Sequence, residues 1–320
     1  MLELPPKKSV GSTHGKLIMV GEHAVVYGKP AIALPFPVIE ATSTVKEMSG
    51  TKLSTEIIID CLYFVGSLEE VPERMSGIAS CIKETLRDLD EKPEGLHIRL
   101  SSTVPVGRGL GSSAAVAIAI VKSLFSFHGQ ELTHEKLMTL VHIAETHAHG
   151  TPSGIDMAAA SSDLPIWFQK EEQPTPLQIG TPFHLVVADT GRIGDTRMAV
   201  ESIRGKYQSN PIATQQAIDL LGEITYSAKD ALLNGELELL GITLNSAQNE
   251  LINLGVSDEG IDNLVRVARE AGALGAKLTG GGRGGCIIAL AKNKRHANKL
   301  AQALSAAGAY QTWKYQVGGN

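Results

Sequence analysis

Three glycines spaced two residues apart constrain this chain more than any other feature. They stand at positions 107, 109 and 111 of the stretch Pro-Val-Gly-Arg-Gly-Leu-Gly-Ser-Ser-Ala-Ala (105–115). Upstream, the alternation in residues 95–101 predicts a half-buried strand, and downstream the apolar run 114–121 predicts a buried helix. Glycines let the backbone approach a ligand, and the open amides at a helix N-terminus attract anions. This order of strand, glycine loop and helix therefore predicts a phosphate-binding site.

A plain tight turn capped by Ser112 is the alternative, but such a turn needs neither three spaced glycines nor two hydroxyls. The loop lacks the Lys-Ser or Lys-Thr of a Walker motif, and its spacing is not that of a dinucleotide fingerprint. The stretch resembles the ATP loop of the GHMP kinases, a superfamily that includes galactokinase, homoserine kinase, mevalonate kinase and phosphomevalonate kinase. The resemblance implies ATP contacts from Pro105, Gly107, Arg108, Gly109, Leu110, Gly111, Ser112, Ser113 and Ala114.

Composition bounds the class of protein. A chain of 320 residues suggests two domains, and 43% hydrophobic with 20% charged residues is typical of a soluble globular protein. With a net charge of −5 and no long apolar run, we expect neither nucleic acid nor a membrane as partner. Three scattered cysteines (Cys61, Cys81 and Cys286) predict reduced thiols in a cytoplasmic protein.

Hydrophobic periodicity predicts both strands and helices along the chain. Strands are expected at 15–21, 31–34, 38–45, 165–168, 184–189, 276–279, 286–290 and 309–317. Helices are expected at 72–89, 133–149, 157–161, 197–207, 211–233, 236–253, 258–271 and 294–305.

The N-terminal stretch Gly-Lys-Leu-Ile-Met-Val-Gly-Glu-His (15–23) is a short strand led by Lys16 and followed by Glu22 and His23. Taken alone, Lys16 is a solvated cation at a strand end, and Glu22 and His23 are a surface pair. The stretch resembles the first motif of the mevalonate kinases. That resemblance implies that Lys16 takes part in catalysis and substrate binding, and that Glu22 and His23 help hold the substrate.

His142, Glu145 and His149 share one face of the helix predicted at 133–149, which begins after the N-cap candidate Thr133. Their order, His-x-x-Glu-x-x-x-His, matches neither common zinc motif, so we expect no zinc site. The resemblance instead implies that Glu145 binds Mg²⁺ together with the hydroxyl of Ser113 and ATP phosphate oxygens. Mg²⁺ prefers such oxygen ligands.

Asp156 ends the stretch Gly-Thr-Pro-Ser-Gly-Ile-Asp (150–156), directly before a helix of small residues. An N-cap aspartate is the plain interpretation. The stretch also resembles the mevalonate kinase motif whose aspartate faces the substrate hydroxyl. The resemblance implies that Asp156 binds the substrate and is catalytic, accepting the hydroxyl proton or orienting the hydroxyl.

Two loops in the second half of the chain complete the motifs. In residues 190–197 the resemblance places Thr196 near the transferred phosphoryl group, although Thr196 equally suits an N-cap of the next helix. The glycine-rich loop 280–285 joins two predicted strands and resembles the C-terminal loop of the GHMP kinases. Arg283 stands where that family usually has glycine, so it either points into water or reaches an anionic group of ATP or the substrate.

Four motifs in family order cover the whole chain. They imply an α+β, two-domain GHMP kinase fold with the active site in the cleft between the domains. The N-terminal domain (1–185) would be ribosomal-protein-S5-like and carry the phosphate loop, and the C-terminal domain (186–320) would be α/β. A homodimer is compatible with this resemblance.

The implied reaction is Mg-ATP-dependent phosphorylation of the 5-hydroxyl of (R)-mevalonate, which feeds isoprenoid synthesis. The alternatives are another small-alcohol kinase, such as a phosphomevalonate kinase, and a non-catalytic ligand sensor. The presence of both Lys16 and Asp156 argues against a sensor, which has no need of a proton acceptor.

Overall fold

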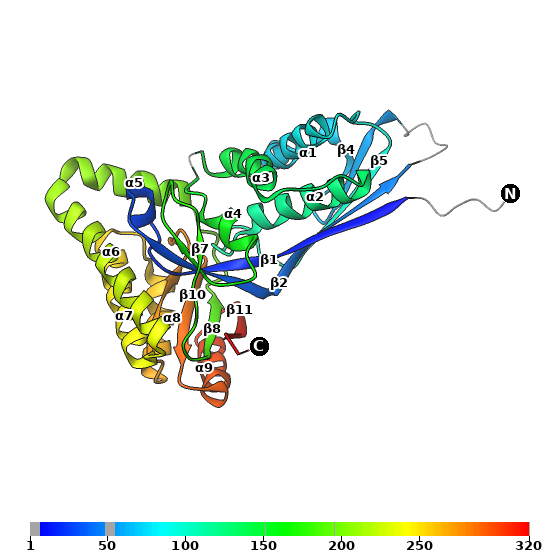
Figure 1. Ribbon diagram of the computed structural model, residues 1–320. Coiled ribbons are helices and arrows are strands. Elements are labelled where there is room, and N and C mark those ends of the chain that lie inside the picture. The colour runs from blue at the N-terminus through cyan, green and yellow to red at the C-terminus, as the bar shows by residue number, and fades with distance from the viewer. Residues whose placement is uncertain (1–6, 49–54, 151, 195, 320) are drawn as a thin grey trace. The chain divides into compact units, whose positions relative to one another are not determined.

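The computed structural model describes residues 7–48, 55–150, 152–194 and 196–319 (Figure 1). The chain forms two compact units that interleave along the sequence. Unit 1 holds the described residues up to Gly15, Ile39–Pro105 and Gly111–Ser161, and unit 2 holds Lys16–Val38, Val106–Leu110 and the chain from Ser162 onward. Strands β1 (Lys8–Val20) and β2 (Ala31–Glu47) each pass from one unit into the other. The division after residue 185 stays a prediction.

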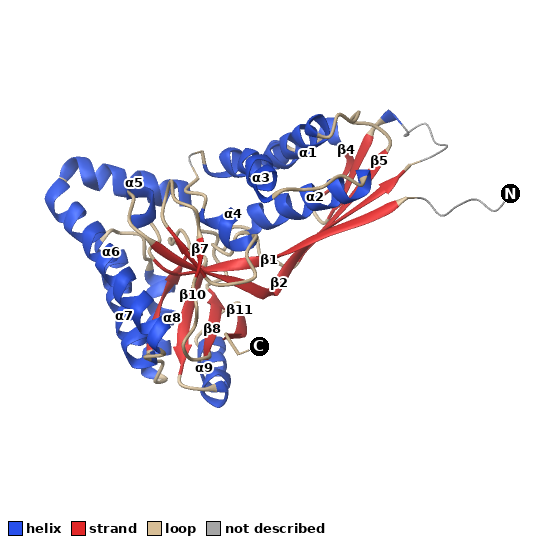
Figure 2. Ribbon diagram, viewed as in Figure 1, coloured by secondary structure: helices blue, strands red, loops and turns tan. Residues whose placement is uncertain are grey.

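Unit 1 packs helices against a sheet, as the colouring of Figure 2 makes clear. Its strands are hydrogen-bonded in the order β4 (Phe64–Ser67), β3 (Ile57–Cys61), β5 (Leu96–Ser102) and the second half of β2. Strands β3 and β5 run parallel, and the neighbouring pairs are antiparallel. The helices are α1 (Ser76–Asp88), α2 (Ser112–His128), α3 (His134–His149) and α4 (Ile155–Ala160). Side chains from these strands and helices form one core.

Helix α2 lies in that core because its sequence is apolar on every side. Ala114, Ile118 and Val121 are fully buried, as the run 114–121 predicts. The helix begins after Gly111 and ends before Gly129, and both glycines have the left-handed backbone that favours glycine. The predicted N-cap of α3 is confirmed, since the Thr133 hydroxyl accepts a hydrogen bond from the Lys136 amide.

Unit 2 is built on a four-stranded antiparallel sheet. Its order is β11 (Gln311–Val317), β8 (Phe183–Asp189), β10 (Cys286–Ala291) and β9 (Gly275–Thr279). Its helices are α5 (Thr196–Ser209), α6 (Pro211–Asn234), α7 (Leu237–Asn253), α8 (Glu259–Glu270) and α9 (Lys294–Ala306). The first half of β2 pairs with β6 (Ile166–Phe168), which pairs with β7 (Thr175–Pro176). The first glycine-rich loop lies between β5 and α2, and the second joins β9 to β10.

Three predicted boundaries differ from the structure. The strands expected at 31–34 and 38–45 are one strand, because β2 continues through Pro35 and Pro37. The helix expected from residue 72 begins only at Ser76, after a single short 3-10 turn. The strand expected at 15–21 is longer, because β1 runs from Lys8 to Val20. The remaining predicted helices and strands lie within a few residues of their expected positions.

The three cysteines are free thiols, of which Cys81 and Cys286 are buried and Cys61 is half-buried. Burial raises the pKa of Cys81 to about 12, so this thiol stays protonated at neutral pH. None of the helices in the described part of the chain is long and apolar enough to cross a membrane.

Candidate active site

Four ionisable side chains of unit 2 are buried within electrostatic reach of one another. Lys16 lies on β1, Glu22 and His23 lie in the turn after β1, and Lys277 lies on β9. Their exposed fractions are 1%, 2%, 5% and 0%. The interpretation of Lys16 as a solvated cation is therefore wrong, and so is that of Glu22 and His23 as a surface pair. Buried charges require partners, so this cluster indicates a functional site.

Strands β1 and β9 are joined at this cluster by the side chain of Thr279. Its hydroxyl accepts a hydrogen bond from the Ile18 amide at 2.9 Å and donates one to the Ile18 carbonyl at 3.0 Å. The Lys16 amide donates to the Leu110 carbonyl at 3.0 Å, which ties β1 to the first glycine loop. These contacts bring Lys16 and Lys277 to the same part of unit 2.

Lys277 and Glu22 form a fully buried ion pair between Nζ and Oε1. Burial raises the pKa of Glu22, while the ammonium groups of Lys277 and Lys16 act in the opposite direction. Burial lowers the pKa of Lys277, and the Glu22 carboxylate opposes that shift. Within the described residues, the second oxygen of Glu22, Oε2, is buried without a hydrogen-bond partner. A buried acceptor of this kind is suited to a ligand hydroxyl.

His23 is held in its neutral form. Burial lowers its pKa to about 4, because the protonated ring would lose its hydration. Its Nε2 lies 3.0 Å from the Gly281 carbonyl, which can only accept, so Nε2 carries the proton and Nδ1 is an acceptor. The residue has a φ of 65°, a left-handed backbone that is uncommon for a side chain larger than glycine.

The low pKa of His23 should make stability depend on pH. The folded pKa of about 4 lies below the unfolded value of 6.5, so the unfolded chain binds more protons between these values. The stabilisation is fully present above pH 6.5 and is lost as pH falls toward 4, by about 3 kcal/mol in total. Urea unfolding between pH 7 and 4.5 should show a shallower pH slope for His23→Gln than for the wild type. Equal pH slopes for the two proteins would contradict the lowered pKa of His23.

The first glycine loop packs backbone to backbone against the second. A Cβ on Gly109 would lie 2.7 Å from the Thr279 carbonyl oxygen, and one on Gly107 would lie 2.7 Å from the Ile193 side chain. Both glycines have positive φ, 74° and 70°. The glycine spacing therefore serves the packing of the loop in addition to its predicted contact with phosphate.

Arg108 directs its side chain away from the loop into unit 2. Its Nε lies 3.0 Å from the carboxylate of Asp189, and another guanidinium nitrogen donates to the Gly191 carbonyl at 2.9 Å. Asp189 is nearly fully buried, so this pair anchors the loop to the end of β8. An ATP contact by the backbone of Arg108 stays a prediction.

The first glycine loop is followed by Gly111 and α2, which belong to unit 1. Gly111 is the N-cap, with a φ of 77°, and Ser112 is the first helical residue. The Ser112 hydroxyl donates to the Val104 carbonyl at 3.3 Å, so Ser112 does not cap the helix. Ser113 is half-buried and Ala114 is fully buried. The free amides of this helix turn are the feature that suits a phosphate group.

Glu145 and Asp156 also lie in unit 1. Glu145 is on α3 with 1% of its surface exposed. Asp156 is the second residue of α4, whose N-cap is Gly154, so the interpretation of Asp156 as an N-cap is wrong. Its carboxylate lies in the first turn of α4. The side chain of His149 lies outside the described residues.

Ser113 and Glu145 fit a magnesium ion in chemistry. Both offer oxygen donors, and they lie on α2 and α3, which pack together. Over the described ranges, no group of three or more His, Cys, Asp or Glu side chains could hold a metal by itself. An ion held by this serine and glutamate would take its other ligands from phosphate and water, as Mg²⁺ commonly does.

Thr196 and Arg283 lie around the second glycine loop in unit 2. Thr196 is the first residue of α5 and its hydroxyl faces Gly281, so Thr196 is not the N-cap. The guanidinium of Arg283 lies 2.8 Å from the Ser202 hydroxyl and 3.4 Å from the Gly255 carbonyl. The interpretation of Arg283 as a side chain in water is therefore wrong.

Each unit thus gathers part of the predicted site. Unit 2 brings together Lys16, Glu22, His23, Thr196 and the second glycine loop, and unit 1 holds Ser113, Glu145 and Asp156. Lys277 was not predicted. The one available signal was a lone charged residue in a strand that is otherwise apolar and leads into a glycine loop.

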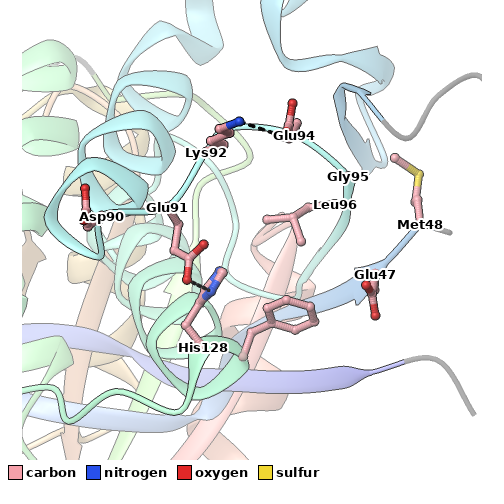
Figure 3. A pocket seen from close by; sticks show the side chains of 10 residues that line it. Glu47, Met48, Asp90, Glu91, Lys92, Glu94, Gly95, Leu96 and His128 are labelled. Carbon is pink, nitrogen blue, oxygen red and sulfur yellow. Dashed lines mark ion pairs between the residues drawn. The ribbon is translucent and has the colours of Figure 1, made fainter. Parts of the chain in front are cut away.

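A separate pocket in unit 1, of about 520 Å³, contains none of the predicted site residues (Figure 3). Figure 3 shows His128 facing Glu91 in this pocket, with Nδ1 at 3.0 Å from the carboxylate. The candidate site therefore rests on the buried cluster and the glycine loops, and not on this hollow.

Two sequence patterns of one family match the chain. The GHMP kinases N terminal domain matches residues 76–163, and the GHMP kinases C terminal domain matches residues 228–309. Together they cover more than half of the chain. The chain belongs to the GHMP kinases.

This GHMP kinase has curated and solved relatives that cover more than nine tenths of its length. The mevalonate kinase of Pyrococcus furiosus is 33% identical over 94% of both chains. The crystal structure of mevalonate kinase from methicillin-resistant Staphylococcus aureus is 32% identical, with a TM-score of 0.75 over 98% of this chain and 100% of that one. The crystal structure of L. major mevalonate kinase in complex with R-mevalonate is 27% identical, with a TM-score of 0.83 over 97% and 95%. The predicted α+β, two-domain GHMP kinase fold is confirmed.

Proposed function

We propose that this GHMP kinase is a mevalonate kinase. It transfers the γ-phosphoryl group of ATP to the 5-hydroxyl of (R)-mevalonate and releases 5-phosphomevalonate and ADP. The observation that carries the proposal is the burial of Lys16, Glu22 and His23, because these residues form the motif that resembles the mevalonate kinases. The full-length similarity to enzymes of that name supports it.

The first glycine loop and the N-terminus of α2 provide the phosphate contacts. The amides of the first glycine loop and of the first turn of α2 donate to the phosphate oxygens of ATP. Ser113 and Glu145 would hold Mg²⁺, which offsets the negative charge of the phosphates. The Thr196 hydroxyl donates to the transferred phosphoryl group. Phosphoryl transfer depends mainly on such positioning and charge compensation.

The acceptor hydroxyl is handled by charged side chains. Asp156 accepts the proton of the 5-hydroxyl or orients that hydroxyl toward the phosphorus. The ammonium of Lys16 stabilises negative charge on the phosphoryl oxygens as it develops. The open Oε2 of Glu22 accepts a hydrogen bond from a substrate hydroxyl, and Nδ1 of neutral His23 accepts another.

A coupled assay of ADP release tests the proposal. The purified protein is given Mg-ATP with equal concentrations of mevalonate, phosphomevalonate, homoserine or galactose. The kcat/KM for mevalonate should exceed each of the others by at least about 10³-fold, because a site built around a specific hydroxyl leaves buried groups unpaired with the wrong substrate. A preference for phosphomevalonate, or no ADP release with any alcohol, would overturn it.

Replacing Glu145 by Gln should weaken the apparent affinity for Mg²⁺, since it removes a charged ligand of a hard cation and keeps the shape. We expect the Mg²⁺ concentration at half-maximal rate to rise about tenfold, with most activity recovered at high Mg²⁺. The control is Glu135→Gln, in the first turn of the same helix. An unchanged Mg²⁺ titration for Glu145→Gln would make Glu145 a structural residue. A cytoplasmic location and a homodimer stay predictions.

A further inference from the structure

Arg283 is the only residue other than glycine in the sequence of the second glycine loop, Gly-Gly-Gly-Arg-Gly-Gly (280–285). Its φ is 53°, in the left-handed region where glycine is favoured and a larger residue is strained. Its amide donates to the Val256 carbonyl at 2.8 Å, which fixes this conformation. A side chain is therefore kept at a position where the backbone favours glycine, which points to a role for the guanidinium.

The guanidinium of Arg283 contacts two parts of unit 2 that are far apart in the sequence. It donates to the Ser202 hydroxyl at 2.8 Å, within α5, and lies 3.4 Å from the carbonyl of Gly255, in the turn between α7 and α8. Both contacts are within unit 2, and Arg283 and Ser202 are half-buried. Arg283 thus links the glycine loop, the turn and α5.

The start of α5 depends on this loop for its position. A Cβ on Gly194 would lie 2.7 Å from the Gly282 carbonyl oxygen, and one on Gly284 would lie 2.8 Å from the Ile193 carbonyl oxygen. The hydroxyl of Thr196 faces Gly281 directly. These close approaches leave little room, so a small shift of α5 changes where the Thr196 hydroxyl lies over the loop.

The second half of α5 is held by contacts that do not involve Arg283. Lys206 donates to the Asn253 carbonyl at 2.8 Å, and Tyr207 stacks on Tyr27 with ring centroids 5.9 Å apart. Ser202 lies six residues after Thr196, between those contacts and the start of the helix. The contact with Arg283 therefore acts on the first two turns of α5.

We propose that Arg283 is a positioning residue for phosphoryl transfer, which acts through Ser202 to fix the first two turns of α5 and the Thr196 hydroxyl over the second glycine loop. This inference rests on the proposed function, in which Thr196 contacts the transferred phosphoryl group. In this role the Arg283 guanidinium acts through its contacts with Ser202 and Gly255 and not by binding substrate or phosphate itself.

The decisive variant is Arg283→Gly, because glycine suits the φ of 53° and relieves the backbone strain. A purely structural side chain would leave kcat intact and the thermal midpoint unchanged or higher. We expect instead that kcat falls about tenfold, while the KM values for ATP and mevalonate stay within about twofold, since a misplaced group costs transition-state stabilisation more than ground-state binding. Arg283→Lys, which keeps a donor, should recover part of kcat.

Ser202→Ala removes the same contact from the side of α5. It should lower kcat in the same direction, and the double variant Arg283→Gly/Ser202→Ala should be no slower than Arg283→Gly alone, because both changes break one interaction. The matched control is Asp90→Gly, an exposed residue of unit 1 with a φ of 56°, and its kcat should stay within about twofold of the wild type. Independent, multiplying losses in the double variant would overturn the proposal.

Hydrogen exchange separates this inference from the proposed function. In Arg283→Gly the amides of residues 199–203 should exchange at least about tenfold faster than in the wild type, with residues 205–209 unchanged, whatever the substrate is. If the wild type phosphorylates a different alcohol, the proposed function fails and the kcat comparison is made with that alcohol. Unchanged exchange in residues 199–203, or a kcat within twofold of the wild type, would overturn the role of Arg283.

Discussion

Asp156→Asn is expected to lower kcat for mevalonate phosphorylation by about 10²–10⁴, the usual effect of losing a general base. The amide retains the shape of the side chain but cannot accept the hydroxyl proton. The KM for ATP should change little, because Asp156 lies in the first turn of α4 and not in a glycine loop. Steady-state rates from coupled ADP release measure both parameters.

The control for this variant is Asp163→Asn, an exposed aspartate close to Asp156 in the sequence. Its kcat should equal that of the wild type within about twofold. If Asp156→Asn folds with the thermal midpoint of the wild type and retains a near-normal kcat, Asp156 is not the proton acceptor. The proposed function would survive that result, but the base would have to be another residue.

Lys277→Met is expected to lower the free energy of unfolding by about 3–5 kcal/mol, the range found when one partner of a buried ion pair is removed. Methionine fills a similar volume but leaves the Glu22 carboxylate buried without its cation, where burial already raises the pKa of Glu22. Urea unfolding at pH 7 measures the loss. A loss below about 1 kcal/mol would show that the buried Lys277–Glu22 pair stabilises the fold no more than a solvent-exposed ion pair does.

The double variant Glu22→Gln/Lys277→Met separates stability from activity. It removes both charges, so much of the lost free energy of unfolding should return. Activity should stay low, because a neutral amide oxygen is a weaker acceptor for the substrate hydroxyl than the Glu22 carboxylate. The matched control is Lys29→Met/Asp219→Asn, a surface pair of the same unit whose side chains are 33% and 44% exposed, and it should leave the free energy of unfolding nearly unchanged.

The periodic segments and the glycine loops were predictable because their causes are local. Helix α2 needs only its apolar run and two flanking glycines, and Thr133 caps α3 from within the helix. The exception is β2, where Pro35 and Pro37 suggested an interruption that the strand does not have. Proline is compatible with a strand wherever its missing N–H has no ladder partner, and sequence alone does not reveal that.

The burial and partners of the site residues were not predictable for a different reason. Whether Lys16 is solvated or buried depends on residues 94 and 263 positions away, Leu110 and Thr279, whose backbone and side chain hold β1. Lys277 pairs with Glu22, which is 255 residues away in the sequence, and Arg283 contacts Ser202, which is 81 residues away. A lone lysine in a strand or arginine in a loop has the same local sequence whether it faces water or protein. The family motif identified Lys16, Glu22 and His23, but it contained no signal for their ion-pair partner.

The interleaving of the two units has a consequence for synthesis on the ribosome. Residues 16–38 belong to unit 2, most of which follows residue 161. At about 5–20 residues per second, Glu22 is made roughly 10–50 s before Lys277. Throughout that interval the Glu22 carboxylate lacks its ion-pair partner, and the apolar segment Leu17–Val20 lacks the Thr279 side chain that hydrogen-bonds the backbone of Ile18. The nascent chain must therefore keep an apolar segment from aggregating until β9 has been made, when only β10, α9 and β11 follow among the elements described.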